Sequence, residues 1–358
     1  MKPLVITASG ACTPVGTRAW LTACALNAHQ SAFTRIQMPD HIDHRATVSP
    51  VSAIPTDESG TDRLLRLATP ALIEALRASP AAWPLQRPLM AFIALPQLWP
   101  ELPQHFDAER FQLELPRALD VAAEYLPMRL FVGGACAGAD ALSAAYRFMH
   151  ANPKVDEVLV GGVDSLCDAP VARALYQRGW AKVNRHTEGF IGAEGAAFVR
   201  LGRDATSEEF ASVYPPGIGQ EDCARVGVED LLSGKGLIDA VEQALQASAM
   251  PVDALHTYWS DLDGTPWRGS EAASLSAALA ARGGLPPLRD PAGSLGQMGA
   301  AWVPLMLSLF LEMRQIHHHP MVPQSIAGHA ALQSVTGLDE RIAAWVCTWS
   351  RTSGVQTH

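Results

Sequence analysis

An apolar strand that runs through two glycines into a helix of small residues constrains this chain more than any other feature. Residues 129–132 predict the strand, Gly133-Gly134 ends it, and residues 137–150 predict a helix rich in alanine and glycine. Two further apolar runs, 89–95 and 157–163, have the length and composition of buried strands. Buried strands that alternate with helices are typical of sheets covered by helices. We therefore expect an α/β fold.

The length of the chain and a polar segment near its middle predict two halves. At 358 residues the chain exceeds a typical single hydrophobic core. Residues 202–209 are polar and acidic, and a boundary there gives halves of residues 1–203 and 204–358. In the first half, residues 190–201 predict two short strands around Gly192 and Gly195. In the second half the order repeats, with a strand around Ser212, helices over 228–247, 270–281 and 298–314, and strands over 255–259, 330–333 and 343–349.

Charge and cysteine usage disfavour several classes of protein. Acidic residues outnumber basic ones by 36 to 27 without any Lys/Arg-rich run, so a nucleic-acid partner is disfavoured. The longest apolar stretches, such as residues 299–311, are too short to span a bilayer, and the N-terminus lacks the apolar core of a signal peptide. Six cysteines without CxxC spacing indicate reduced thiols and a cytoplasmic location. The histidine run 317–319 predicts a helix end, so we expect no metal there. The glycine pairs match neither GxGxxG nor GxxxxGK(S/T), so we also expect no nucleotide cofactor.

Cys136 stands where the helix after the two glycines begins. A helix N-terminus carries partial positive charge and free N–H groups, which favour a thiolate over a thiol. The thiolate is the reactive form of cysteine. A free cysteine is also commonly a small buried hydrophobic residue. The junction by itself therefore leaves open whether Cys136 is a nucleophile or part of the core.

Four segments of the first half are rich in glycine and small or apolar residues: Val5–Gly16, Gly134–Leu142, Val158–Ser165 and Glu188–Ala197. In this order they resemble segments of the β-ketoacyl synthases of the thiolase superfamily, where an Ala-Cys pair opens a helix of small residues. The resemblance implies the thiolase fold, in which two βαβαβαββ halves form a five-layer α-β-α-β-α sandwich, and it implies a homodimer. It also implies that Cys136 has the position of the reactive thiol, and it makes Glu194 of the Gly-x-Glu-Gly segment a candidate site residue.

Where that family has two histidines beside the cysteine, this chain has other residues. The first histidine normally opens a His-Gly-Thr-Gly-Thr-Pro segment, and here Gly264-Thr265-Pro266 puts Asp261 in its position. The second normally precedes Gly-Ala-Ala, and here Gly299-Ala300-Ala301 puts Gly296 or Gln297 in its position. An ionised carboxylate cannot donate a hydrogen bond to an enolate oxygen, and it raises the pKa of a neighbouring thiol. Gln297 could donate such a bond but cannot act as an acid or a base.

Other parts of the family's site are weakly matched. The closing Gly-Phe-Gly-Gly-Thr loop, which supplies an oxyanion N–H, is only faintly similar to residues 352–357. His186 and His256 are candidate donors to the sulfur. Five tryptophans of the second half predict core packing, and they would plug the acyl tunnel if they lined the cleft: Trp259, Trp267, Trp302, Trp345 and Trp349.

Two hypotheses follow from the kept cysteine and the missing histidines. The first is a ketosynthase-like protein that no longer condenses and has an accessory or adaptor role. Residues 261–268 and 291–301 resemble altered forms in a subgroup found in bacterial type VI secretion gene clusters. The second is an acyltransferase or thioesterase-like enzyme in which Cys136 takes an acyl group from a thioester of acyl carrier protein or coenzyme A. The expected protein partner is an acyl carrier protein or a secretion-system component.

Overall fold

The two halves of the chain have the same order of strands and helices in the computed structural model. The structure describes residues 2–38, 43–78, 85, 87–185, 187–205, 207–221, 233–317, 328–338 and 340–351. The first half contains β1 (Leu4–Cys12), α2 (Gly60–Arg77), β4 (Ala91–Leu95), α3 (Ala108–Ala118), β5 (Met128–Val132), α4 (Ala137–Ala151), β6 (Glu157–Ser165) and β7 (Gly192–Gly202). The second contains β8 (Glu209–Val213), α6 (Lys235–Ser248), β10 (Thr257–Ser260), α7 (Pro266–Leu279), β11 (Leu288–Arg289), α9 (Trp302–His317), β12 (Ala330–Thr336) and β13 (Arg341–Arg351).

Shorter elements are added to this repeat. The further helices and strands are α1 (Ala19–Asn27), β2 (Thr34–Gln37), β3 (Arg45–Ser49), α5 (Ala169–Gln177), β9 (Gly217–Gln220) and α8 (Ala292–Leu295). Two short 3-10 turns, η3 (Gly134–Cys136) and η6 (Gly299–Ala301), lead directly into α4 and α9.

The strand order within the sheet is also the same in both halves. It is β5-β4-β6-β7-β1 in the first half and β11-β10-β12-β13-β8 in the second. The two halves join where β1 pairs antiparallel with β8, with Leu4 opposite Val213. The expected boundary at residues 203/204 falls between β7 and β8.

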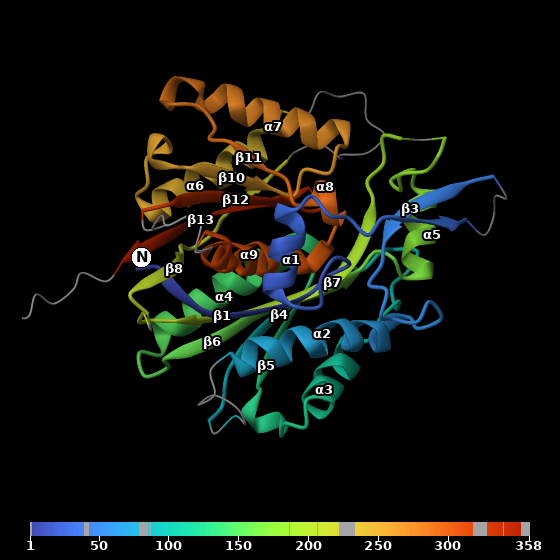
Figure 1. The fold of residues 1–358 in the computed structure, drawn as a ribbon, viewed down its shortest axis with the longest axis horizontal. Helices are drawn as coiled ribbons and strands as arrows, with labels where there is room; N and C mark the ends of the chain where they lie inside the picture. The colour runs from blue at the N-terminus through green and yellow to red at the C-terminus, as the bar shows by residue number, and fades with distance from the viewer. Residues whose placement is uncertain are drawn as a thin grey trace, which may run out of the picture.

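The elements form five layers (Figure 1). Helices α6 and α7 cover one outer face, followed by the part of the sheet that contains β10, β12 and β13. Helices α4 and α9 lie in the middle, followed by the part of the same sheet that contains β1, β7, β6 and β4, and then by α2 and α3. This arrangement, with βαβαβαββ in each half, confirms the predicted α/β thiolase fold.

Small residues let the two central helices approach closely. A Cβ atom placed on Gly138 of α4 would lie 2.7 Å from the Cβ of Val303 on α9, so a larger side chain would force the helices apart. The alanines next to Gly138 are fully buried at this contact. The close approach also brings η3 and η6 into contact. The turn that carries Cys136 therefore meets the turn that follows Gln297.

Three predicted elements differ from the structure. Residues 192–202 form one strand instead of two short ones. Gly195 does not interrupt this strand; it lets β7 pass close to β1, because a Cβ atom placed on Gly195 would lie 2.5 Å from the carbonyl oxygen of Cys12. Of the helix expected at 228–247, residues 228–232 lie outside the described residues, and α6 begins at Lys235. The helix expected from residue 298 begins at Trp302, after the η6 turn. Within the described residues, no helix is both long enough and apolar enough to cross a membrane.

Candidate active site

The backbone before Cys136 folds sharply, as its glycines require. Gly134 has a φ of +66°, in the left-handed region that glycine adopts without strain, and Cys136 is the residue that precedes α4. The side chain of Cys136 is buried, with 1% exposure. Its sulfur donates a hydrogen bond to the carbonyl oxygen of Arg341 on β13, at 3.1 Å. Because a carbonyl oxygen only accepts, this contact requires a protonated thiol.

A small cavity lies beside the Cys136 turn. Gly134 and Ala135 line it, together with Gly299 of the η6 turn, whereas Cys136 itself does not. Its volume is about 20 Å³, close to the roughly 10–15 Å³ that a single water requires. An acyl chain therefore has no room in this arrangement.

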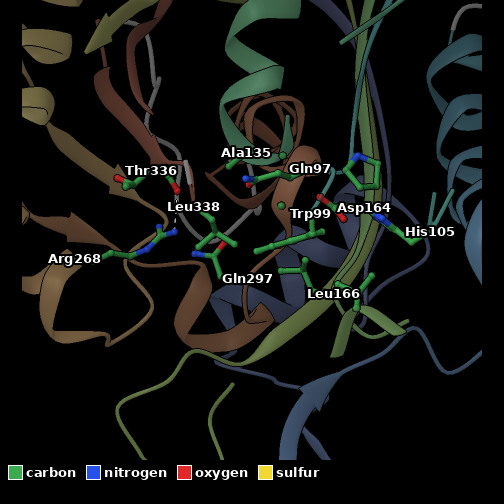
Figure 2. A pocket seen from close by; sticks show the side chains of 14 residues that line it. Gln97, Trp99, His105, Ala135, Asp164, Leu166, Arg268, Gln297, Thr336 and Leu338 are labelled. Carbon is green, nitrogen blue, oxygen red and sulfur yellow. Dashed lines mark hydrogen bonds between the residues drawn. The ribbon is translucent and has the colours of Figure 1, made fainter. Parts of the chain in front are cut away.

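Side chains from distant parts of the chain fill the space around this cavity. Figure 2 shows Arg268 and Gln297 on one side, Asp164 and His105 on the other, and Trp99 between them in this view. Trp99 is 3% exposed, and the Arg178 guanidinium lies 4.6 Å from its ring centre and 4.9 Å from that of Trp180. This stack holds Trp99 in place at the cavity.

Asp261, which we predicted to take the position of the first histidine, takes part in a buried ion pair. It follows β10 directly, is 1% exposed, and forms an ion pair with Arg268 of α7. Arg268 also donates to the carbonyl oxygen of Thr336 at 2.8 Å, and the N–H of Thr336 donates to Asp261 Oδ2 at 3.1 Å. Burial raises the pKa of Asp261, against the opposing effect of Arg268. Asp261 thus links β10, α7 and the end of β12.

A second carboxylate belongs to the same cluster. The Asp263 side chain is buried, and its Oδ2 lies 3.2 Å from Arg268 Nε. Burial lowers the pKa of Arg268, but the two aspartates outweigh this and raise it. Arg268 therefore stays charged, as the cation between two buried carboxylates.

Gln297, which we predicted to lie at or near the position of the second histidine, forms hydrogen bonds through both its amide nitrogen and its amide oxygen. Its Nε2 donates to the carbonyl oxygen of Asp261 at 3.2 Å and to Asp263 Oδ2 at 3.0 Å. Its Oε1 accepts a hydrogen bond from Trp302 Nε1 at 2.6 Å. An amide nitrogen has two hydrogens, so none is left for an oxyanion. Gly296, in the alternative register, has a φ of +81°.

Glu194 lies in a separate cluster that does not line the cavity. Its carboxylate accepts two hydrogen bonds from Arg63, at 2.6 and 2.8 Å. It also accepts from the N–H of Val51 at 2.8 Å and from Ser165 Oγ at 2.6 Å. Glu194 is fully buried, and these bonds tie β7 to α2 and β6. The structure therefore does not bring Glu194 together with the other predicted site residues.

Asp164 is a cavity residue that the sequence interpretation missed. It lies near the carboxyl end of β6, is 2% exposed, and accepts a hydrogen bond from the N–H of Ala300 at 2.8 Å. Burial raises its pKa to about 7. The available signal was an acidic residue at the end of an otherwise apolar strand.

The other predicted site residues have different outcomes. His256 packs against His329, with ring centres 5.0 Å apart, and does not line the cavity. His186, residues 352–357 and residues 318–319 of the histidine run lie outside the described residues. Thr336, the last residue of β12, and Leu338, which lies between β12 and β13, line the cavity. Among the described residues, no group of three or more His, Cys, Asp or Glu could hold a metal ion.

Four of the five tryptophans of the second half pack in the core, as predicted, whereas Trp267 is only partly buried and its ring centre lies 4.6 Å from the Arg268 guanidinium. Trp302, Trp345 and Trp349 are at most 1% exposed, and Trp259 is 6% exposed. The tryptophan that lines the cavity is Trp99, from the first half.

Comparisons with known proteins identify the fold. No protein-family model and no curated protein matches the chain. The ishigamide ketosynthase/chain length factor is 17% identical, with a TM-score of 0.71 over 98% of this chain and 100% of that one. The ketosynthase ApeO in complex with its chain length factor ApeC, from Xenorhabdus doucetiae, is 14% identical, with a TM-score of 0.75 over 97% and 98%. The complex AntDE:AntF, a type II polyketide synthase acyl-carrier protein with its ketosynthase, is 13% identical, with a TM-score of 0.75 over 97% and 99%. The chain therefore has the thiolase-like fold of the ketosynthases.

Proposed function

We propose that this chain is a ketosynthase-like protein that does not condense acyl groups and that acts by binding a protein partner. The observation that carries the proposal is the filled site. The cavity has room for about one water, and the two histidine positions hold Asp261, paired with Arg268, and a fully hydrogen-bonded Gln297. Neither residue can stabilise a developing enolate oxygen.

The partner proposed follows from two likenesses. Residues 261–268 and 291–301 resemble the subgroup found in type VI secretion gene clusters, which favours a component of that secretion system. Two similar structures are of complexes, one with an acyl-carrier protein and one with a chain length factor, which favours an acyl carrier protein as the alternative. A cytoplasmic location agrees with the free thiols of Cys12, Cys24, Cys136, Cys167 and Cys347.

The reactivity of Cys136 separates this proposal from the acyltransferase alternative. Cys24 on α1 is exposed and serves as a reference thiol in the same molecule. We expect iodoacetamide at neutral pH to label Cys136 at least about tenfold more slowly than Cys24, because a buried thiol reacts only after local opening, and about 1.4 kcal/mol of opening free energy slows the reaction tenfold. Peptide mapping of timed samples, with Cys136→Ala as the control, measures both rates.

Acyl loading is the second arm of this test. After incubation with acyl-coenzyme A or acyl-carrier-protein thioesters, we expect no acyl adduct in the intact mass. Labelling of Cys136 faster than Cys24, or an adduct that disappears in Cys136→Ala, would contradict the proposal and favour acyl transfer.

We also propose a homodimer formed through β5. This strand is at one end of the sheet order and pairs with β4. Val132 at its end is 42% exposed. An exposed strand edge with apolar side chains is a template for pairing with a second copy.

Substitution at this edge tests the dimer. Val132→Glu is expected to weaken the dimer about 30-fold or more, because a buried unpaired charge at an interface costs about 2 kcal/mol or more. Light scattering over a dilution series would show a shift toward the 38.3 kDa monomer. Leu288→Glu on β11, the corresponding end strand of the second half, is the matched control, since Leu288 is 48% exposed. Equal effects of the two variants, or a wild type that is monomeric throughout, would exclude this interface.

A further inference from the structure

A second hollow in the molecule shares no lining residue with the cavity beside Cys136. It is an open groove of about 790 Å³, formed by β1, the start of α1, α2 and the end of α9. Its size is within the range of small-molecule sites, and its lining combines apolar side chains with charged ones of both signs.

Glu312 of α9 supplies an unsatisfied carboxylate to this groove. The residue is 8% exposed, and Ser9 Oγ donates a hydrogen bond to its Oε1 at 2.8 Å. Its Oε2 is buried and has no hydrogen-bond partner. Burial of an ionised oxygen without a partner is unfavourable, so a donor that entered the groove would gain a strong hydrogen bond.

Glu74 of α2 adds a second carboxylate on the same groove. Its Oε2 accepts hydrogen bonds from the N–H groups of Ala11 and Ala19, both at 3.0 Å. Burial raises the pKa of Glu312, and the negative charge of Glu74 raises it further. Among the described residues no cation lies within ion-pair distance of either carboxylate, although the charge of Arg18 lowers the pKa of Glu74 against the effect of burial. Two like charges in one groove therefore favour a ligand that brings a positive charge.

The remaining lining indicates which cation would fit. Trp20, Ile73 and Leu311 provide apolar surface, which suits the carbon chain of an organic amine better than a hydrated metal ion. An ammonium group has three donors and no acceptor, which complements the two carboxylates. Arg18, Arg77 and Arg314 also line the groove, and they would repel a second positive charge but attract a carboxylate.

We propose that this groove binds a zwitterionic amine, with its ammonium group at Glu312 and Glu74 and its anionic group at the arginines. The class of ligand is an ω-amino carboxylate, in which an apolar spacer separates the two charges. Glu312 is the residue that selects the ammonium end, because its Oε2 is the acceptor that the fold leaves unsatisfied.

Three probes of one chain length test each part of the proposal by titration calorimetry on the full chain. They are 6-aminohexanoate, hexylamine, which lacks the anion, and hexanoate, which lacks the ammonium group. Titrations with 4-aminobutanoate and 8-aminooctanoate then determine which length of carbon chain between the two charges fits the groove best. We expect at least one of the three amino carboxylates to bind about tenfold more tightly than hexylamine and hexanoate. Equal or tighter binding of hexanoate, or no binding by any amino carboxylate, would overturn the proposal.

Matched variants assign the contacts. Glu312→Gln keeps an acceptor for Ser9 but removes the charge, and it should weaken the best amino carboxylate about tenfold or more. Arg18→Gln should weaken the amino carboxylate but not hexylamine, whose binding should stay the same or tighten because the repulsion by Arg18 is lost. Glu124→Gln, on an exposed residue outside the groove, should change nothing. Unaltered binding in Glu312→Gln, with an unchanged circular dichroism spectrum, would also overturn the proposal.

Discussion

Replacement of Arg268 by methionine is expected to lower the free energy of unfolding by about 3–5 kcal/mol, the range for a buried ion pair that loses one partner. Arg268 and Asp261 are 3% and 1% exposed, so water cannot compensate for the lost cation. Asp263 would be left unpaired as well, since its Oδ2 lies 3.2 Å from Arg268 Nε. Urea denaturation at pH 7.5 measures the change.

Two comparisons make this result specific. Arg268→Met combined with Asp261→Asn should recover part of the loss, because the second change removes one of the stranded charges. Arg87→Met breaks an ion pair of exposed side chains with Asp156 and should have little effect. If Arg268→Met were no more destabilising than Arg87→Met, the buried cluster of Arg268, Asp261 and Asp263 would not contribute to the stability of the fold as we expect.

The same cluster explains why a single histidine would not recreate a synthase site. Asp261→His would put an imidazole against the Arg268 guanidinium and leave that cation without its closest carboxylate. Repulsion by Arg268 would also disfavour a protonated histidine. A histidine at this position would therefore also require changes in α7 and in the segment around Gln297.

Asp164→Asn is expected to stabilise the protein at neutral and alkaline pH by up to about 4 kcal/mol. The pKa of Asp164 is raised to about 7 in the folded protein, against about 3.9 in an unfolded chain. A group whose pKa is raised on folding stabilises the fold below its unfolded pKa, and this contribution is lost as the pH rises through the folded pKa. The loss for Asp164 thus falls between about pH 4 and pH 7, at about 1.4 kcal/mol per unit of pKa shift.

The expected signature is a difference in pH dependence between the two proteins. Asparagine can still accept the N–H of Ala300 through its Oδ1 but does not ionise. The gain in unfolding free energy of Asp164→Asn should therefore be small near pH 4.5 and largest at pH 8, by urea denaturation. Asp156→Asn, on an exposed aspartate, should show no such trend. A gain that stays constant with pH would show that Asp164 does not titrate differently in the folded state.

Local patterns in the sequence predicted the fold because they report on burial and close approach. The two glycines before Cys136 and the small residues after it predicted a sharp turn into a closely packed helix, and α4 packs against α9 in that way. Gly195 shows a limit of this reasoning. A glycine within a strand predicts an interruption as readily as a close contact, and only the neighbouring β1 distinguishes the two.

The site was less predictable because its chemistry depends on partners that are remote in the sequence. The backbone carbonyl oxygen of Arg341 accepts a hydrogen bond from the Cys136 thiol, 205 positions away in the sequence. The Arg63 guanidinium donates to Glu194, 131 positions away. Cys136 and Glu194 lie in segments that resemble the β-ketoacyl synthases. Their partners Arg341 and Arg63 lie outside those segments, so the segments could not predict them. Arg268, by contrast, is seven positions from Asp261, within reach of one helical turn and a short loop.

The sequence by itself determined the α/β fold and the place of Cys136 at the start of α4. Those properties follow from local residue patterns. Only the tertiary structure decided that the Cys136 thiol donates to a carbonyl oxygen and that both amide hydrogens of Gln297 are used in hydrogen bonds. It also decided that the cavity has a volume of about 20 Å³. The reason is physical: a cavity is what remains after side chains from both halves have packed, and no local pattern specifies that remainder.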